Sequence, residues 1–426
     1  MKNLLFLAYF FPPHGGGGVL RSVETVRLLS SHGWRSTVVA GPEDGYWIKD
    51  ESLLGRLPQS TKVLRAGALN PVRILGFSSR RQEVKEGVRS ERAIRKWRRL
   101  ADWLPVPDVY CTWIAPAVRK SLEAASQMDW IMSTSPPESA HLAAWYLAGR
   151  TGTRWAADFR DPWVRGIYRE FPTALHKALQ RRLERMVVQR ADLVLATSEE
   201  AVEDFRSRYP EQPEDKFQFV PNGFDSTEFS NFPHHPPPNA PLTIIHTGNL
   251  TLDRDPVPLF RAVAALNREF GGKSPCCKIE LVGLCDRRAH KAAQEILSGD
   301  VVTFSGYLPR GEVLKKLAGV HLALLLESFA SNAEFVVPGK LYDYLGAHVP
   351  VLALVPEGAA SRLIEKTGCG VAVTEPDSRE IQITLRDLLD CLRNGKPLFP
   401  PAEENELACY ERSAVVGRLA ELLDRQ

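Results

Sequence analysis

Short apolar runs alternate with helical patterns along most of the chain, and this alternation constrains the fold more than any other feature. The first run, at 3–9, is continuously apolar, which is typical of a strand buried on both faces of a parallel sheet. A glycine-rich loop, a helical repeat of valine and leucine at 19–29 and a second apolar run at 37–40 follow. Strand, loop, helix and strand form a βαβ unit, so we predict an α/β fold with parallel sheets and right-handed crossovers.

The alternation occurs in two blocks, separated by a proline-rich stretch. Further strands are predicted at 130–133, 155–158, 192–197 and 217–220 in the first block, and at 242–246, 278–282, 301–304, 322–326 and 350–354 in the second. The segment between the blocks contains PNG and HHPPPNAP, which are typical of a linker. We therefore predict domains at 1–220 and 242–395, a hinge at 221–241, and a C-terminal segment at 396–426 with a helix at 404–424.

Composition excludes several classes of protein. Of the 426 residues, 44% are hydrophobic and 25% are charged, as in soluble globular proteins. A net charge of +3 is too small for a nucleic-acid coat. Seven cysteines without a Cys-x-x-Cys pair disfavour a disulfide framework or a zinc ribbon and fit a reducing cytoplasm. The N-terminal apolar run is too short for a membrane span and lacks a cleavage site, so we expect a cytoplasmic chain.

Four glycines, Gly15, Gly16, Gly17 and Gly18, lie between the first predicted strand and its helix. Without side chains, the backbone amides of this loop can approach an anion or a sugar closely. The spacing matches neither the dinucleotide fingerprint nor a P-loop. A flexible turn remains the alternative interpretation.

A charged cluster, Asp158, Arg160 and Asp161, follows a predicted strand. Ligands of parallel sheets bind at the carboxyl ends of the strands, and paired carboxylates there could orient an acceptor hydroxyl or share a proton. The alternative is a surface salt-bridge cluster.

In the second block, Gly248 and Asn249 follow the first strand, and Arg254 comes shortly after them. A glycine permits close approach of a ligand, and an arginine binds a diphosphate through paired N–H donors. A local ion pair of Arg254 with Asp253 or Asp255 is the alternative.

Further along, Glu334 precedes a turn that opens the helix KLYDYLG, which contains Lys340 and Asp343. The N-terminus of this helix would present amides to a phosphate, and we place Asp343 in its first turn. Ordinary charge decoration of a helix terminus is the alternative.

Two basic stretches lie in the first block. Residues 80–99 hold nine Lys/Arg against three Glu, a net of +6, with apolar residues at helical spacing, and residues 177–190 are also cationic. Such helices can lie on an anionic membrane or bind a lipid-linked acceptor, although a solvated helix face is the alternative for each. No aromatic platform accompanies them, so nucleic acid is not expected. The scattered histidines show no metal-ligand spacing.

Taken in order, several strings resemble a family 4 glycosyltransferase of the GT-B fold, in the branch that builds bacterial surface polysaccharides. They are FPPHGGGGVLR, STSPPESAHL, ADFRDPW, ADLVLATSEE, VPNGFD, IHTGNLTLDRDP, VVTFSGYLP, VPGKLYDYLGAHVPVLAL and GCGV. The resemblance implies two Rossmann-like parallel-sheet domains facing a cleft, with the last helix packing back on the first domain. It also implies retaining transfer of a sugar from a nucleoside-diphosphate sugar to a saccharide or lipid-linked acceptor, without a metal or cofactor.

The resemblance also implies roles for individual residues. The glycine loop and Asp161 would face the acceptor, Arg254 and Lys340 would hold the diphosphate, Glu334 would contact donor-sugar hydroxyls, and Asp343 the ribose. The donor side would be completed by Gly248, Asn249, Gly306, Tyr307, Leu308, Phe335 and Val336.

Three departures from the family pattern affect these roles. Asn249 stands where the family often has arginine, and Glu334 matches the first glutamate of a paired motif only with a one-residue shift. The family's active-site histidine would fall near Arg160, so its role passes to Asp158, Arg160 or Asp161. Two other functions stay open: a GT-B sugar-nucleotide epimerase and, because of these departures, a nucleotide-sugar-binding protein without catalysis.

Overall fold

The computed structural model describes residues 1–44, 49–68, 106–167, 169, 171–238, 241–250, 254–272, 274–375, 377–400 and 402–425. These residues form two compact units. The first contains the described residues up to Asn222 together with the chain from Arg412 onward, and the second runs from Gly223 to Glu411. The basic stretch at 80–99 lies outside the described residues.

The first unit is built on a seven-stranded sheet in the order β3-β2-β1-β4-β5-β6-β7, with every pairing parallel. Its strands are β1 (Lys2–Leu7), β2 (Trp34–Ala40), β3 (Lys62–Arg65), β4 (Trp130–Ser135), β5 (Arg154–Phe159), β6 (Leu193–Ala196) and β7 (Phe217–Phe219). Its helices are α1 (Gly17–Ser31), α4 (Ile114–Ala125), α5 (Ser139–Thr151), α6 (Ala174–Arg190), α7 (Glu199–Arg208) and α15 (Arg412–Arg425), with the short helix η1 at Glu51–Arg56.

Burial explains why the strands of this sheet consist mostly of consecutive apolar residues. Leu4, Leu5, Phe6 and Leu7 in β1 are all buried, because β1 lies between β2 and β4 and helices cover the sheet. Removal of such side chains from water is the main stabilising contribution to a core of this kind. The carboxyl ends of the central strands therefore have fixed positions, and the loops that follow them can carry a site.

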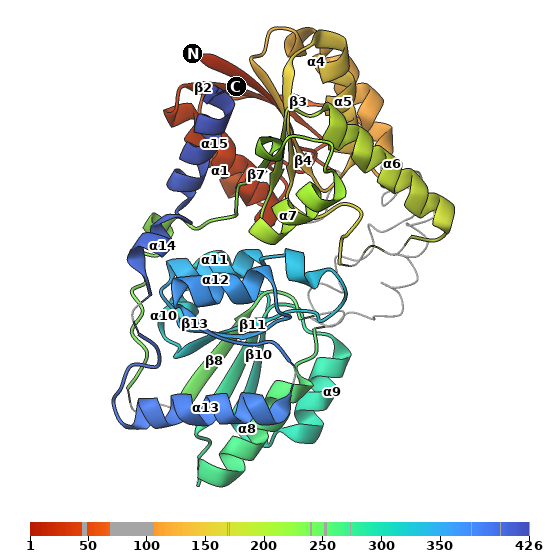
Figure 1. Cartoon of the computed structure of the whole chain (residues 1–426). Coiled ribbons are helices and arrows are strands. Elements are labelled where there is room, and N and C mark those ends of the chain that lie inside the picture. Colours follow the sequence, from red (N-terminus) through yellow and green to blue (C-terminus); the bar gives the residue numbers. More distant parts are fainter. Residues whose placement is uncertain are drawn as a thin grey trace. The chain divides into compact units, whose positions relative to one another are not determined.

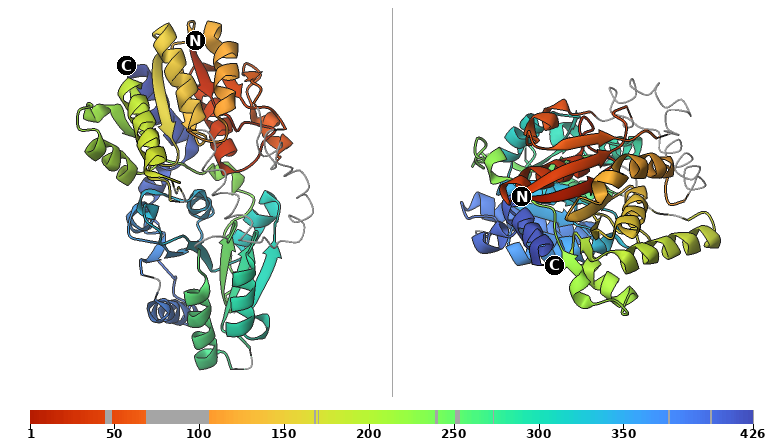
Figure 2. Two further views of the ribbon diagram at one scale, coloured as in Figure 1. Left: turned by 90° about the vertical axis from the view of Figure 1, so that its right-hand side faces the viewer. Right: turned by 90° about the horizontal axis from the view of Figure 1, so that it is seen from above.

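The chain returns to the first unit at its C-terminus. Helix α15 packs against α1 (Figure 1), and Val415, Val416 and Leu419 join the same apolar core as β1. The indole N–H of Trp130 donates to the carbonyl of Leu423 at 3.0 Å. Both chain ends lie at this unit (Figure 2), where Lys2 pairs with Asp424.

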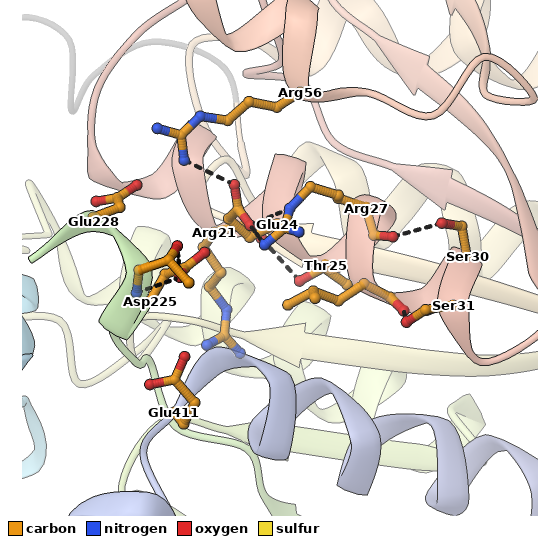
Figure 3. A network of polar contacts seen from close by, with 12 residues as sticks. Arg21, Glu24, Thr25, Arg27, Ser30, Ser31, Arg56, Asp225, Glu228 and Glu411 are labelled. Atoms are coloured by element: carbon orange, nitrogen blue, oxygen red, sulfur yellow. Dashed lines mark hydrogen bonds and ion pairs between the residues drawn. The ribbon is translucent and has the colours of Figure 1, made fainter. Parts of the chain in front are cut away.

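A charged network also fixes the outer side of α1. Glu24 has a side chain only 2% exposed and accepts from Arg27 one turn along the helix and from Arg56 of η1 (Figure 3). Two cations around one buried carboxylate offset its desolvation, so the network holds η1 against α1.

The second unit has a six-stranded parallel sheet in the order β10-β9-β8-β11-β12-β13. Its strands are β8 (Leu242–Thr247), β9 (Cys277–Val282), β10 (Val302–Gly306), β11 (Leu322–Leu326), β12 (Val351–Leu354) and β13 (Gly370–Val373). Its helices are α8 (Val257–Phe270), α9 (Arg287–Ile296), α10 (Arg310–Ala318), α11 (Gly339–Gly346), α12 (Ala359–Thr367), α13 (Ser378–Arg393) and α14 (Glu404–Ala408). Helices α8 and α13 run side by side and share one core with the sheet (Figure 1).

The parallel sheets predicted from the apolar runs are confirmed, with some corrections. Strands β3 and β13 and helices α4, α12 and α13 were not predicted. Strands β3 and β13 have only four residues each and are mostly half-buried, whereas α13 carries apolar residues at helical spacing that the sequence analysis overlooked. The single helix predicted at 404–424 is wrong. It is split into α14 and α15, which belong to different units.

Two further observations concern the chain as a whole. All seven cysteines are free thiols, as their spacing predicted. None of the helices in the described part of the chain combines the length and the apolar composition that a bilayer span requires.

Candidate functional site

In the first unit, the glycine loop leads from β1 into α1. Gly16 is the N-cap of α1 and has φ 105°, a left-handed conformation that favours glycine. A Cβ added to Gly17 would meet no atom within 4 Å, whereas a Cβ on Gly18 would stand 1.9 Å from Nη1 of Arg160. The loop is thus shaped in part by Arg160, which lies across the first turn of α1.

Asp158, at the end of β5, is almost fully buried and has both carboxylate oxygens bonded. Oδ1 accepts from Nη2 of Arg21 at 3.0 Å, and Oδ2 accepts from the hydroxyl of Thr134 at 2.8 Å. Arg21 also donates to the carbonyls of Val220 and Pro221. Asp158 therefore links α1, β4 and β5 to the chain leaving β7, and Arg21 is a residue that the sequence analysis missed.

Arg160 and Asp161 follow β5, and their side chains are more exposed to solvent than that of Asp158. The side chain of Arg160 is 17% exposed and that of Asp161 is 52% exposed, with 4.0 Å between Nε of Arg160 and Oδ2 of Asp161. The hydroxyl of Thr197, after β6, donates to the backbone carbonyl of Arg160 at 2.9 Å. Of the three predicted residues in this cluster, Asp161 offers the carboxylate most open to a ligand.

A second carboxylate, Glu138, begins the helix after β4 and was not predicted. It is buried and pairs with Arg169. Burial, with Asp108 adding repulsion, raises the pKa of Glu138 to about 7 despite that pairing. Only its place in the SPPES string after a predicted strand could have indicated it.

His141 of α5 is fully buried beneath this edge among Trp155, Phe159 and Trp163. Its Nδ1 lies 2.7 Å from the hydroxyl of Ser133, which also accepts from the indole of Trp155 at 2.9 Å. Burial lowers the pKa of His141 to about 3, so the ring is neutral. This arrangement gives His141 a structural role in the core of the first unit.

In the second unit, three neighbouring strands end in glycines with positive φ. They are Gly248 after β8 (104°), Gly283 after β9 (124°) and Gly306 in β10 (64°). The amide of Gly283 donates to the carbonyl of Gly306 at 2.7 Å, and a Cβ on Gly283 would lie 2.3 Å from the carbonyl oxygen of Gly248. The predicted residues Gly248 and Gly306 therefore belong to one close-packed sheet edge.

Beside this edge, two cations converge on Glu327, which follows β11. Nε and Nη2 of Arg254 lie 2.8 and 2.7 Å from Oε2 of Glu327, and Nζ of Lys340 lies 3.1 Å from Oε1. The side chains of Arg254, Lys340 and Glu327 are 20%, 15% and 10% exposed, respectively. The structure thus brings Arg254 and Lys340 together, as their predicted shared ligand requires.

Glu327 itself was missed. Burial lowers the pKa of Lys340, with Arg254 acting in the same direction and Glu327 opposing both. A signal for Glu327 was available, because it is an acidic residue directly after the buried strand predicted at 322–326. Asp158 was selected by the same rule, as an acidic residue at the end of a predicted strand.

His246 of β8 is buried near these cations. Its Nδ1 lies 3.0 Å from the carbonyl of Leu324, so Nδ1 carries the proton and Nε2 presents a lone pair. Burial, and then the charges of Lys340 and Arg254, hold the pKa of His246 well below its usual range. Nε2 of His246 has no hydrogen-bond partner among the described residues.

Asn249 and Asp343 are already bonded within the second unit. Oδ1 of Asn249 accepts from the amide of Leu284 at 3.2 Å. Both carboxylate oxygens of Asp343 accept from Arg310, at 2.9 and 3.3 Å, and Arg310 also binds Glu228. Helix α11 begins at Gly339, so the placement of Asp343 in its first turn is wrong; it lies a full turn into the helix.

The other predicted donor residues surround the start of α11. Glu334 lies in a short 3-10 helix, Ala333–Phe335, and its half-buried carboxylate makes no hydrogen bond or ion pair with the described part of the chain. Phe335 and Val336 continue toward α11, whose N-cap, Pro338, provides no side-chain cap. Tyr307, followed by Leu308, is 76% exposed after β10.

Comparisons with known proteins agree with this architecture. The structure is similar to that of HepE from Anabaena in complex with UDP, at 15% identity and TM-score 0.68. The match covers 100% of this chain and 100% of the HepE chain. It also resembles sucrose-phosphate synthase from Thermosynechococcus elongatus (14% identity, TM-score 0.69, 100% of this chain and 99% of that one) and WaaG, a glycosyltransferase of lipopolysaccharide biosynthesis (14%, 0.60, 99% of each chain). No curated protein matches the sequence significantly.

The two parallel sheets and these likenesses define the fold as that of the GT-B glycosyltransferases, which confirms the predicted fold class. Residues 16–223 match the family model of the glycosyl transferase 4-like domain. The match covers slightly less than half of the chain and confirms the resemblance to family 4 glycosyltransferases that its motifs indicated, whereas the surface-polysaccharide branch stays a prediction. Sugar transfer is the activity that the match supports.

Proposed function

We propose that the protein transfers a sugar, with retention at the anomeric carbon, from a nucleoside-diphosphate sugar to an acceptor hydroxyl. The pathway we propose is biosynthesis of a cell-surface polysaccharide or glycolipid at the cytoplasmic face of a membrane. The observation that carries the proposal is the convergence of Arg254 and Lys340 beside the glycine-lined edge of the second sheet.

Two partly buried cations at such an edge suit a diphosphate. Anions gain most from fixed positive charge where water is largely excluded, and Gly248 lets a ligand approach: a Cβ there would meet only the Cε of Lys340, at 4.0 Å. HepE, which shares the fold, was solved with UDP and with UDP-glucose. A uridine nucleotide is therefore the first donor to test.

The chemistry breaks the bond between the anomeric carbon and the diphosphate oxygen. In the proposal, Arg254 and Lys340 stabilise the charge that develops on that oxygen. The new bond forms from the acceptor oxygen to the same face of the sugar, and the acceptor proton passes to the departing phosphate. Glu334 would contact sugar hydroxyls. Asp343 is bonded to Arg310 but is 27% exposed, so it would still accept from the ribose. No metal or cofactor takes part.

On the acceptor side, we assign Asp161 and the glycine loop to the acceptor hydroxyl. Asp158 has both oxygens bonded, so its role in the proposal is to position Arg21 and the start of α1. Arg160 lies over Gly18, where its charge can act on an acceptor bound at the glycine loop.

A membrane-borne acceptor is favoured by the surface of α6. Leu175 and Leu179, one turn apart, are 67% and 41% exposed, and Lys177, Arg181 and Arg182 are exposed around them. The helix has one acidic residue, Glu184, which is buried against Arg208 and Tyr209. Exposed leucines among uncompensated cations are typical of helices that lie on anionic bilayers.

The proposal is tested first by binding and then by transfer. Thermal unfolding with UDP, GDP, ADP and dTDP should identify one nucleotide that raises Tm, because a ligand at a hundred times its Kd adds about 2.7 kcal/mol to stability. The corresponding labelled sugar nucleotide, incubated with membrane extract, should then give a labelled glycolipid or glycan.

Arg254→Ala should abolish most of that transfer, whereas Arg261→Ala on the next helix, α8, should not. An altered free sugar would support the epimerase instead, and binding without any product would support a non-catalytic protein. If no nucleotide and no sugar nucleotide binds, the proposal fails.

A further inference from the structure

The pair of cations assigned to the diphosphate is not open in this structure. Arg254 points its Nε and Nη2, the edge with which a guanidinium binds a carboxylate or phosphate side-on, at Oε2 of Glu327. Lys340 lies against the other oxygen of the same carboxylate. Glu327 thus occupies the place between the two cations that an anionic ligand would take.

The surroundings show that this carboxylate only partly satisfies the cations. Nζ of Lys340 and Oε1 of Glu327 are 3.1 Å apart, yet neither has a well-directed hydrogen bond within the described residues. The buried Nε2 of His246 also lacks a partner there. Buried polar atoms are nearly always hydrogen-bonded, so the unpartnered Nε2 of His246 beside this ion pair indicates a site that is completed by a further group.

The charges decide between two roles for Glu327. The trio of Arg254, Lys340 and Glu327 carries a net charge of +1, and without the carboxylate it would carry +2. A diphosphate that binds to the cations must approach Glu327 as a like charge, at a place where Coulomb interactions are weakly screened. Burying two cations together without a counter-charge would in turn be costly in the empty protein.

From this arrangement we propose that Glu327 is an internal counter-anion, a positioning residue that stands in for the diphosphate between Arg254 and Lys340. It pairs the two cations when the site is empty, competes with the diphosphate for them, and speeds release of the nucleotide product. The inference rests on the proposed function, because it takes Arg254 and Lys340 as the diphosphate ligands.

The test is isothermal titration of the full chain with inorganic pyrophosphate and, separately, with UDP. Pyrophosphate has no base or sugar, so it reports on the phosphate site alone. Glu327→Gln keeps the shape of the side chain and removes its charge, and we expect both ligands to bind at least fivefold more tightly. UDP should also inhibit transfer by the variant at correspondingly lower concentration, and the ligand-free variant should melt at a lower temperature than the wild type.

A matched control is Glu280→Gln. Glu280 is a half-buried carboxylate of β9 that pairs with Lys316 and accepts from Ser305, and its contacts include neither Arg254 nor Lys340. We expect unchanged affinity for pyrophosphate in this variant. Glu327→Asp keeps the charge but is one methylene too short to reach both cations, so we expect an intermediate gain in affinity. It serves as the second variant if Glu327→Gln does not fold.

The outcomes separate the two proposals. Weaker or unchanged binding of both ligands in a folded Glu327 variant, with the wild type binding normally, overturns the counter-anion role and leaves the proposed function standing. If neither the wild type nor any Glu327 variant binds pyrophosphate or a nucleoside diphosphate, the proposed function and this inference both fail.

Discussion

Gly18 leaves the space that Arg160 fills. A Cβ on Gly18 would stand 1.9 Å from Nη1, 2.4 Å from Cζ and 2.9 Å from Nη2 of Arg160. The contact joins the first turn of α1 to the loop after β5. These two parts of the chain lie 142 residues apart in sequence. Of Gly16, Gly17 and Gly18, only Gly18 leaves a space that a charged side chain fills.

Gly18→Ala should therefore displace the guanidinium of Arg160 without unfolding the protein, because the end of an arginine side chain moves easily. We expect a loss of transfer of about tenfold or more, since a misplaced charged group near the reacting atoms costs rate steeply, and a change in unfolding free energy below about 1 kcal/mol. Gly149→Ala in α5, where an added Cβ also meets nothing within 4 Å, is the control and should leave transfer near the wild-type rate. Equal effects in the two variants would show that Arg160 is not the cause.

Asp158→Asn should destabilise the first unit strongly. It leaves Arg21, whose side chain is 13% exposed, without its counter-charge, and breaking a buried ion pair in this way costs roughly 3–5 kcal/mol. The free energy is measured by urea unfolding. Glu421→Gln, which removes an exposed pair with Arg425, should cost less than about 1 kcal/mol. A small effect at Asp158 would mean that the pair with Arg21 does not hold the chain leaving β7.

Glu334→Gln should lose most transfer, about a hundredfold, with an unchanged Tm, because Glu334 makes no bond to the described part of the chain that its loss could break. The rate loss follows if its carboxylate hydrogen-bonds sugar hydroxyls as charge develops at the anomeric carbon. Glu357→Gln, an exposed carboxylate of the same unit, controls for the change in net charge. Wild-type turnover in Glu334→Gln would remove this residue from the site.

His141 should make the protein sensitive to acid. Its folded pKa of about 3 lies below the ordinary value of 6.5, so between these values the unfolded chain binds a proton that the folded one does not. Stability therefore falls as pH falls from 7, by about 2 kcal/mol between pH 7 and pH 5 for this one residue. In His141→Gln, which cannot titrate, the same pH change should cost about 2 kcal/mol less, as measured by urea unfolding at each pH. If the unfolding free energies of the wild type and of His141→Gln fell equally with pH, the low folded pKa of His141 would be contradicted.

The exposed face of α6 should bind anionic membranes. We expect the protein to sediment with phosphatidylglycerol vesicles at low salt and not with neutral phosphatidylcholine vesicles. Replacing Arg181 and Arg182 by glutamate should abolish sedimentation, because each cation near the surface contributes about 1 kcal/mol. Leu175→Ser with Leu179→Ser should weaken it, whereas Leu54→Ser, at another exposed leucine of the same unit, should not. Unchanged sedimentation of all variants would place the membrane contact elsewhere.

The candidate site was only partly predictable. Residues at the end of a buried strand or directly after it, such as Asp158 and Gly248, could be selected because parallel strands all end at the same edge of a sheet. Arg21 and Glu327 were missed, although they bind Asp158 and Arg254. Arg21 lies within an ordinary helical repeat, which gives no signal of a site. Glu327 directly follows a predicted buried strand, so the same rule would have selected it, but neither position shows its partner in sequence.

Local patterns in the amino-acid sequence are enough to predict the architecture of this chain. Apolar runs, helical repeats and glycine or proline punctuation are local signals, and they were enough to predict two parallel-sheet units and the edges at which ligands bind. Only the tertiary structure decided which side chains are already bonded and which remain accessible. Asp158, Asp343 and Asp161 look alike in the sequence, but the first two are bonded by Arg21 and Arg310 and the third is half exposed. The physical reason is that the charge partners of a buried group come from distant segments, and folding alone sets the distances on which their interaction depends.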